Sequence, residues 1–346
     1  MKCQLAEATH KVWPGRTFFT TSASGGMPPT AVYMPPNHNE TTSLNVLLFF
    51  HGFYVGSTEA LINSDNTRLC EQVLMAGKDV VLIAPWLGAK WGSGAANGTL
   101  RTDQFGQPRF TQRFLRAVLD ALPAPSSTPA AGPPPTEGVD AISGAGPVVA
   151  TRYSVKNLVV ACHSAGGAAM LNAVDTLGDF ESQLRECVGL DCLYNGGDAK
   201  FWFERAQKNA PPTYIVFGPS TVPQSIRLYL LAKGRADAAG NERTPPAPPL
   251  GNVSVRPGHF SSFLYGGVST NVSSSIDRVI DDLIARPPPP GSSTSKAATA
   301  DFVTQSAVNF AANYIFPVGE GDARGGIHYF IARAFLRERL GAVRLA

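Results

Sequence analysis

The hydrophobic positions of this chain gather in short runs that alternate with amphipathic stretches. Several runs of strand length are continuously apolar, as in strands covered on both faces. These predicted strands are Leu44–Phe50, Val80–Ala84, Leu158–Ala161, Val188–Leu190, Tyr214–Phe217 and Val253–Val255. Between them the patterns predict helices over about Thr58–Ala76, Phe110–Leu122, Gly166–Leu177, Ala199–Asn209 and Gln224–Ala238. This alternation predicts an α/β protein with a mostly parallel central sheet and helices on both faces.

The 346-residue chain is predicted to form a single domain, 1–346, interrupted by surface insertions. Segments rich in proline, glycine and serine lie at about 123–150, 244–251 and 286–296. Two helical patterns, Asp277–Ala285 and Asp301–Asn313, follow the last strong strand. We therefore expect residues 260–325 to form either a cap over the functional site or a C-terminal extension that packs on the sheet.

Composition excludes several classes of protein. Apolar residues make up 44% of the chain, which excludes global disorder. Charged residues make up 16%, the formal net charge is +3, and the basic residues are scattered, so we expect no nucleic-acid partner. No apolar stretch approaches the roughly 20 residues that cross a bilayer, and the first residues lack the apolar core of a signal peptide. The sequence is compatible with a cytoplasmic protein or a mature secreted one, and it leaves the oligomeric state open.

The five cysteines indicate neither a metal site nor an established disulfide framework. Cys3, Cys70, Cys162, Cys187 and Cys192 show no Cys-x-x-Cys or Cys/His spacing of the kind that holds zinc. In or beside predicted core strands, cysteine behaves as a small apolar residue. A disulfide between Cys187 and Cys192 is compatible with the sequence but not established by it, and no metal or organic cofactor is implied.

The most informative segment is Asn157–Met170, in which an apolar run ends at Cys162-His163-Ser164 and very small residues follow. A serine between a strand and a helix is the arrangement that exposes a nucleophile on a sharp turn. The usual G-x-S-x-G pattern is present as C-H-S-A-G, so Cys162 replaces the first glycine. We expect the Cys162 side chain to point into a pocket rather than across the turn. The alternative is a strand–helix turn without chemistry.

Two backbone N–H groups near Ser164 are candidates for stabilising an oxyanion. The Ala165 N–H lies at the start of the predicted helix, where backbone donors are free of helical partners. The sequence FFHGF ends at Phe53 and follows the first strong strand, so the N–H of Phe53 or a neighbour is the second candidate. The alternative for this turn is an ordinary strand end with a hydrogen-bonded histidine, His51.

These turns, in this order, resemble those of the α/β-hydrolase fold. The resemblance rests on HGF after one strand, APW at Ala84–Trp86 after the next and CHSAGG after the third, and it covers roughly Leu44 to Phe217. The run Leu190–Gly196, LDCLYNG, is similar to a strand end in a subgroup of bacterial hydrolases with an LDALYG-like sequence. The resemblance implies a serine hydrolase with a Ser-His-acid triad and a structural role for His51.

The resemblance also limits where the acid of the triad can lie. In most members of the fold it follows the second strand beyond the serine, but here that strand, TYIVF, is followed by GPSTVPQS, which has no carboxylate. The preceding strand ends at Asp191, an alternative location known in the superfamily, so Asp191 is the predicted partner of the histidine. Asp198 is the rival, although we favour a helix N-cap role for it. A turn-forming role is the alternative for Asp191.

The histidine should follow the acid, which leaves His259 and His328. His259 lies just after a short predicted strand. His328 lies in a glycine-rich segment before a final amphipathic helix, and a glycine-rich loop that delivers a histidine resembles the usual end of this fold. We therefore prefer His328 as the base and keep His259 as its rival.

The predicted function is that of a serine hydrolase acting on a small-molecule or polymeric carboxylic ester through an acyl-enzyme. Tyr54, Trp86 and Trp202 are candidates for binding the substrate, with core packing as the alternative. The same triad serves an amidase, a peptidase or a cell-wall hydrolase, and a noncatalytic binding protein of this fold is an alternative of a different class. A cysteine hydrolase using Cys162 is disfavoured, because that side chain should point into the core.

Overall fold

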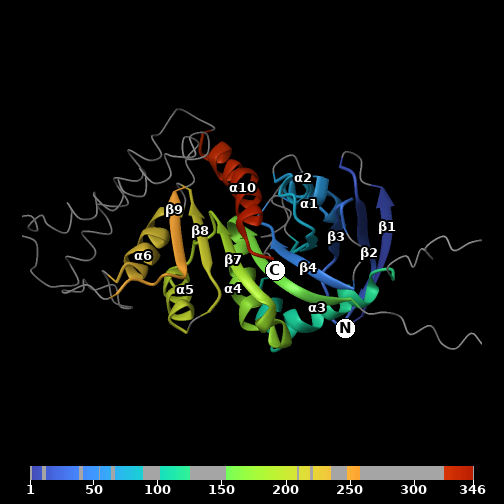
Figure 1. The fold of residues 1–346 in the computed structure, drawn as a ribbon, viewed down its shortest axis with the longest axis horizontal. Coiled ribbons are helices and arrows are strands. Elements are labelled where there is room, and N and C mark those ends of the chain that lie inside the picture. The colour runs from blue at the N-terminus through green and yellow to red at the C-terminus, as the bar shows by residue number, and fades with distance from the viewer. Residues whose placement is uncertain are drawn as a thin grey trace, which may run out of the picture.

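A computed structural model of the chain describes residues 2–9, 13–38, 42–53, 55–63, 67–88, 102–124, 153–208, 210–218, 221–234, 248–257 and 323–345. These residues form a nine-stranded sheet in the order β1-β2-β3-β5-β4-β6-β7-β8-β9 (Figure 1). The strands are β1 (Lys2–Thr9), β2 (Arg16–Ser24), β3 (Thr30–Met34), β4 (Ser43–Phe50), β5 (Val81–Pro85), β6 (Ser154–His163), β7 (Leu184–Leu190), β8 (Thr213–Phe217) and β9 (Val253–Pro257).

The sheet is mixed, and its two parts differ in strand direction. The pairs that join β1, β2, β3 and β5 are antiparallel, whereas β5, β4, β6, β7, β8 and β9 are parallel neighbours. From β4 the chain first adds β5 on one side and then returns to add β6 on the other. The prediction of a mostly parallel α/β sheet is confirmed. Its consequence for the site is that β6, which ends just before Ser164, lies between β4 and β7.

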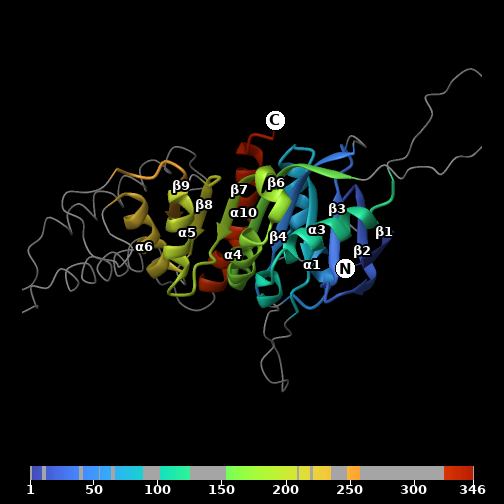
Figure 2. The ribbon, with the colours of Figure 1, turned by 90° about the horizontal axis from the view of Figure 1, so that it is seen from below.

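Helices cover both faces of this sheet (Figure 1, Figure 2). Buried residues of α3 (Phe110–Ala121), α4 (Gly167–Asp175), α5 (Asp198–Gln207) and α6 (Val222–Ala232) join one apolar cluster. Buried residues of α1 (Thr58–Asn63), α2 (Leu69–Met75) and α10 (Ala323–Ala342) join the cluster on the opposite face. Short 3-10 helices are η1 (Asp103–Gly106), η2 (Ser164–Gly166) and η3 (Gly178–Gln183). Within the described ranges, no helix combines the length and apolar character needed to cross a membrane.

Two predicted helices differ from those in the structure. The pattern over Thr58–Ala76 forms two helices, α1 and α2, and Arg68 before α2 has a φ of 47°, a left-handed conformation that no α-helix can continue through. The glycine-rich segment before the final helix was expected to be a loop, and that expectation is wrong: Gly325 and Gly326 lie inside α10. His328 therefore lies in a helix rather than in a loop.

Helix α10 is attached to the sheet by charged side chains that cross the helix–sheet boundary. Arg339 donates to the buried Glu186 of β7, and Arg256 of β9 donates to both carboxylate oxygens of Glu338 at 2.9 and 2.8 Å. The guanidinium of Arg256 also lies over the Phe335 ring, 4.7 Å from its centroid. These contacts hold the second half of α10 against the first half of β7 and against the edge strand.

A polar cluster joins the starts of the three central strands. Asn157 of β6 is buried, and its side-chain amide donates to Asn45 Oδ1 of β4 at 2.8 Å. Arg185 of β7 donates from Nε to Asn157 Oδ1 at 2.6 Å. The Asn45 amide in turn donates to the Asp79 carbonyl at 2.9 Å. The buried Asn157 side chain therefore links β6 to both β4 and β7, at the end of these strands opposite Ser164.

Most of the predicted insertions fall outside the described residues. This applies to 125–150 of the first insertion, to 244–247 of the second and to all of 286–296. The helical patterns Asp277–Ala285 and Asp301–Asn313 also lie outside, as does the expected cap or extension up to residue 322.

Candidate functional site

Ser164 lies at the turn between β6 and η2, at the carboxyl end of the central strands. Its φ is 57°, a conformation that costs a non-glycine residue of order 1–3 kcal/mol. Four described non-glycine residues have a positive φ, and two of them are Ser164 and Asp191, at 57° and 48°. Such strained backbone is typical of residues whose side chains must be held in one direction for function. The strand–turn–helix expected from the sequence is thus present at Ser164.

Glycines let two backbone segments approach this turn closely. A Cβ added to Gly52 would lie 2.9 Å from Ser164 Oγ, and one added to Gly166 would lie 2.7 Å from the His51 carbonyl oxygen. No real side chain fits at those distances, so the segment after β4 packs directly against the turn. The clearance expected from the small residues after Ser164 is confirmed at Gly166, and Gly52 performs the same role on the β4 side.

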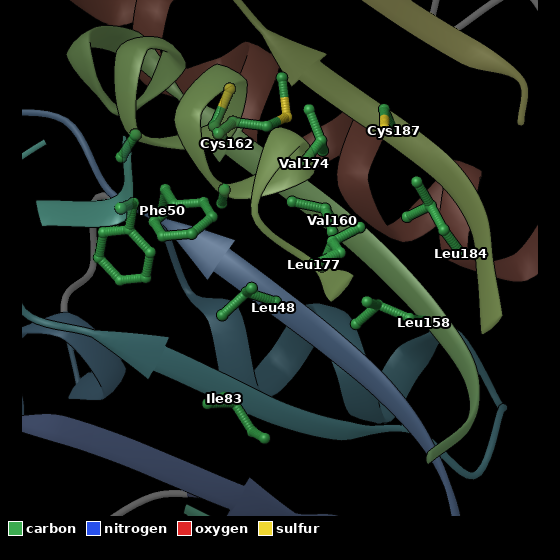
Figure 3. Close-up of a cluster of buried hydrophobic side chains, with 14 of the residues drawn as sticks. Leu48, Phe50, Ile83, Leu158, Val160, Cys162, Val174, Leu177, Leu184 and Cys187 are labelled. Carbon is green, nitrogen blue, oxygen red and sulfur yellow. The ribbon is translucent and has the colours of Figure 1, made fainter. Parts of the chain in front are cut away.

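The Cys162 side chain points into the core, as expected, and not across the turn (Figure 3). Cys162 pairs across the sheet with Gly189, and Cys192 Sγ lies 2.6 Å from where a Gly189 Cβ would be. A hydrogen bond that the Cys192 thiol donates to the Cys162 side chain, together with burial, raises the pKa of the Cys192 thiol. Cys187 and Cys192 are separate thiols in the structure, not a disulfide. Cys162 is completely buried, whereas Ser164 retains 8% of its exposed surface.

Asp191 is the residue that follows β7, and it is fully buried. Its Oδ1 accepts a hydrogen bond from the Gly218 backbone N–H at 2.8 Å and another from the Thr221 hydroxyl. His163 and Leu190 are paired neighbours in the sheet, so Ser164 and Asp191 are the next residues along two adjacent parallel strands. The carboxylate that the sequence singled out therefore leaves the sheet beside the serine, held by donors that follow β8.

Asp198 has a different environment from Asp191. Its Oδ2 accepts the Asn195 backbone N–H at 2.9 Å, and its own N–H donates to the Asn195 carbonyl at 3.0 Å. Burial raises the pKa of the Asp198 carboxyl. Asp198 is thus the first residue of α5 and closes the turn before it, whereas the N-cap is Gly197, so the N-cap role expected for Asp198 is wrong by one residue.

His51 is a buried structural histidine. Its Nε2 accepts the Leu87 backbone N–H at 2.8 Å, so Nδ1 carries the proton and donates to the Gly52 carbonyl at 2.5 Å. Burial is the main cause that lowers the pKa of His51 to about 4. The imidazole is therefore neutral at pH 7 and has both nitrogens occupied, so it connects the turn after β4 to the turn after β5 and cannot act as a general base.

This histidine gives a testable pH dependence of stability. In the unfolded chain His51 takes up a proton near pH 6.5, whereas in the folded chain it does so only near pH 4. The stability that depends on neutral His51 is therefore present above pH 6.5 and is lost as the pH falls to 4, by about 3 kcal/mol. The glutamine amide of His51→Gln can both accept and donate a hydrogen bond but does not titrate. We therefore expect its free energy of unfolding, measured with urea, to fall less between pH 6.5 and pH 4 than that of the wild type. Equal falls in the two free energies would contradict this role of His51.

Of the two candidate bases, the structure describes the backbone of His328 but not His259. His259 lies outside the described residues, two positions beyond the end of β9. His328 lies in α10, which begins toward the end of the sheet where the β9 arrow points and runs back past β7 (Figure 1). The backbone of His328 thus belongs to the first turns of α10.

The two proposed oxyanion donors follow neighbouring strands at the same level. Phe50 of β4 pairs with Cys162 of β6, and Phe53 and Ala165 each lie three residues farther along. Both side chains are partly buried against the same apolar cluster. Together with the Gly52 contact, this brings the HGF turn and the serine turn side by side.

The aromatic candidates for substrate binding have three different outcomes. Tyr54 lies outside the described residues. Trp86 is half-buried after β5, and its indole N–H donates to the Val55 carbonyl at 2.9 Å. Trp202 is fully buried in the core and packs edge-to-face on Phe201 with ring centroids 5.3 Å apart. The expectation that Trp202 lines a substrate site is therefore corrected: it is a core residue.

Tyr194 is the residue at this site that sequence reasoning missed. It lies three residues after Asp191 and is 44% exposed, and partial burial together with the negative charge of Asp191 raises the pKa of its phenol. The LDCLYNG run contained this tyrosine, but spacing from a strand end does not tell which way an exposed side chain turns.

No protein-family model and no curated protein matches this chain. Solved structures that match include a feruloyl esterase module from Clostridium thermocellum, 13% identical with a TM-score of 0.34, covering 63% of this chain and 67% of that one. Carboxylesterase CesB from Bacillus subtilis is 10% identical with a TM-score of 0.26, covering 65% of this chain and 56% of that one. A protein called DphMB1 is 14% identical with a TM-score of 0.35, covering 88% of this chain and 85% of that one. By its own strand order and by the helices on both faces of its sheet, this chain has the α/β-hydrolase fold.

Proposed function

We propose that this protein is a serine hydrolase that acts on carboxylic esters. The observation that carries the proposal is the left-handed backbone of Ser164, held between a parallel strand and a helix with Gly52 packed against its hydroxyl. Glycine would adopt this left-handed backbone with less strain than serine does, so the serine side chain is present at a cost in stability.

In the proposed mechanism Ser164 Oγ attacks the acyl carbon while a histidine accepts the hydroxyl proton. Asp191, held by Gly218 and Thr221, orients that histidine and stabilises the imidazolium. The backbone N–H groups of Phe53 and Ala165 donate to the oxyanion. The alcohol then leaves with the proton of the imidazolium, and water resolves the acyl-enzyme by the reverse sequence of proton transfers. We propose that the histidine is His328 or His259, the two candidates that follow Asp191 in the chain.

A fluorophosphonate probe combined with a substrate panel tests this function. We expect the probe to modify the wild-type protein on Ser164, located by mass spectrometry of the peptide, and short-chain esters to be hydrolysed faster than matched amides and peptides. Esters are favoured because their alcohol departs more readily than an amine, whereas an amidase or peptidase would show measurable peptide cleavage. A protein that is not labelled and yet binds esters without turnover would instead be a noncatalytic member of the fold.

A further inference from the structure

The Asp191 carboxylate accepts hydrogen bonds from two groups of the segment that follows β8. The Gly218 backbone N–H donates to Oδ1 at 2.8 Å, and the Thr221 hydroxyl donates to the same oxygen. Asp191 is fully buried, and a buried carboxylate keeps its negative charge only where hydrogen-bond donors or positive groups replace the water it has lost. These two donors therefore favour the charged carboxylate that the proposed triad requires.

Thr221 directs its side chain away from the helix that it precedes. It is the residue before α6, where a threonine hydroxyl ordinarily accepts a hydrogen bond from an N–H of the first turn. Within α6, whose residues are all described, no N–H donates to this hydroxyl, which donates to Asp191 instead. The Thr221 backbone is held on both sides: its N–H donates to the Gly218 carbonyl at 3.2 Å, and its carbonyl accepts the Ser225 N–H at 3.1 Å. The hydroxyl therefore reaches the carboxylate from a fixed backbone.

Gly218 leaves room for the carboxylate against the same segment. A Cβ added to Gly218 would lie 2.5 Å from Asp191 Oδ2 and 2.8 Å from Cγ, closer than real side chains approach. The Asp191 backbone is fixed as well, since its N–H donates to the Val216 carbonyl of β8 at 2.7 Å. Close packing and two donors on one oxygen thus define both the place and the rotation of the carboxylate.

Three other titratable groups lie in the described segment after Asp191. Burial, with the Asp191 charge as a smaller cause, raises the pKa of the Tyr194 phenol. The hydrogen bond to Cys162 and burial raise the pKa of the Cys192 thiol, again with a contribution from Asp191. Both groups therefore stay protonated in the weakly acidic range where a histidine titrates. Burial also raises the pKa of the Asp198 carboxyl, which is unchanged in any variant of Thr221.

We propose that Thr221 is a positioning residue of the esterase reaction: its hydroxyl holds Oδ1 of Asp191, so that Oδ2 is the oxygen that accepts the N–H of the catalytic histidine. Thr221 keeps its own proton, and no bond to it forms or breaks. With the carboxylate fixed, the imidazole is held in the tautomer whose basic nitrogen faces Ser164, and the imidazolium that forms is stabilised by the carboxylate charge. This inference rests on the proposed function.

Thr221→Val tests this role, because valine keeps the branched shape of threonine and loses the hydroxyl. We expect kcat for a nitrophenyl ester to fall by about 10- to 100-fold while KM stays within about threefold, since the lost hydrogen bond is to a charged group that acts after the substrate has bound. Thr221→Ser restores the hydroxyl and should remain within about threefold of the wild-type kcat.

The pH profile of kcat/KM is a readout that a merely structural role would not change. A carboxylate that loses a donor takes up a proton more readily, so the acid limb of Thr221→Val should move to higher pH by about one unit. The acid limb of Thr221→Ser should coincide with that of the wild type. A structural role would instead lower kcat/KM by the same factor at every pH, in proportion to the folded fraction. That result, an equal loss in the two variants or an unchanged kcat in Thr221→Val would overturn the proposal.

Gly218→Ala is a second variant that tests the same arrangement should Thr221→Val fail to fold. It retains the backbone N–H and the Thr221 hydroxyl, but its Cβ would displace Asp191 Oδ2. We expect kcat to fall by at least about 10-fold with little change in KM. Full activity in Gly218→Ala would contradict the placement of the carboxylate on which the role of Thr221 depends.

A matched control and fluorophosphonate labelling separate this inference from the proposed function. Thr111→Val removes a buried threonine hydroxyl bonded to the Thr176 hydroxyl at 2.7 Å, between α3 and the end of α4, and should leave kcat and the pH profile unchanged. A wild type that is labelled on Ser164, with turnover that does not depend on the Thr221 hydroxyl, contradicts only the positioning role. A wild type that is neither labelled nor active contradicts the proposed function, and the role of Thr221 with it.

Discussion

Replacing Ser164 with alanine is expected to lower kcat/KM for an activated ester by about 10⁴- to 10⁶-fold, the loss typical of a missing serine nucleophile. The substitution removes Oγ alone, so the acyl-enzyme cannot form, while the oxyanion donors and the bound conformation remain. Initial rates with a nitrophenyl ester, measured at enzyme concentrations high enough to see the residual activity, would determine the loss.

We expect the loss of kcat/KM in Ser164→Ala to come from the missing hydroxyl and not from unfolding, and two measurements test this. Alanine retains a side-chain Cβ at a φ of 57°, so the unfolding free energy of Ser164→Ala should lie within about 1 kcal/mol of the wild type. Ser154→Ala makes the same change at the other end of β6, where the hydroxyl donates to the Thr42 carbonyl at 3.3 Å, and should retain wild-type turnover. Turnover by Ser164→Ala at a rate close to the wild type would refute the nucleophile assignment.

Removing the general base should have an effect of nearly the same size. One of the two variants His259→Ala and His328→Ala is expected to lose about 10⁴-fold or more in kcat/KM, because Ser164 then has no group to accept its proton. The other should remain within about threefold of the wild type. Imidazole added to the inactive variant should restore part of the rate, since it can occupy the space of the missing ring and accept the same proton.

The pair of variants is informative because each is the control for the other. The pH profile of kcat/KM adds a second readout: the wild type should lose activity as the histidine becomes protonated, and the inactive variant should not show that step. If both variants keep full activity, the Ser-His-Asp assignment fails, whichever histidine was preferred. If both lose activity equally while remaining folded, the choice between them fails and the triad does not.

The parallel half of the fold could be predicted from the sequence because both faces of its strands are covered. Leu44–Phe50 and Tyr214–Phe217 are nearly uninterrupted apolar runs, and the structure extends each of them by one residue. β6 and β7 are longer than the predicted Leu158–Ala161 and Val188–Leu190, because both strands begin in segments that contain polar residues. The antiparallel strands β1, β2 and β3 were all missed. β1 is largely exposed, and polar residues such as Lys2 and Glu7 interrupt its apolar positions, whereas β3 is buried but only five residues long. The helix break at Arg68 was missed because a left-handed backbone at arginine has no sequence signature.

The residues of the candidate site could also be predicted only in part from the sequence. Ser164 and Asp191 could be found from the sequence because both follow the end of a core strand, a position that parallel topology places at one edge. The exposure of Tyr194 and the burial of Trp202 depend on how α5 packs, which adjacent residues in the chain do not determine. The preference for His328 relied on a loop at Gly325 and Gly326, and glycine was an unreliable guide there because α10 contains both residues.

The Asn45–Asn157–Arg185 cluster has a consequence for variation far from the reacting atoms. It contacts β4, β6 and β7, the same three strands that end near Gly52, Ser164 and Asp191. A parallel pair that slips by one residue turns every side chain to the opposite face. About 20 Å from Ser164, a buried amide thus opposes sliding of these strands along one another. Substitutions in this cluster, at the far ends of the strands, can therefore change how Gly52, Ser164 and Asp191 are positioned relative to one another.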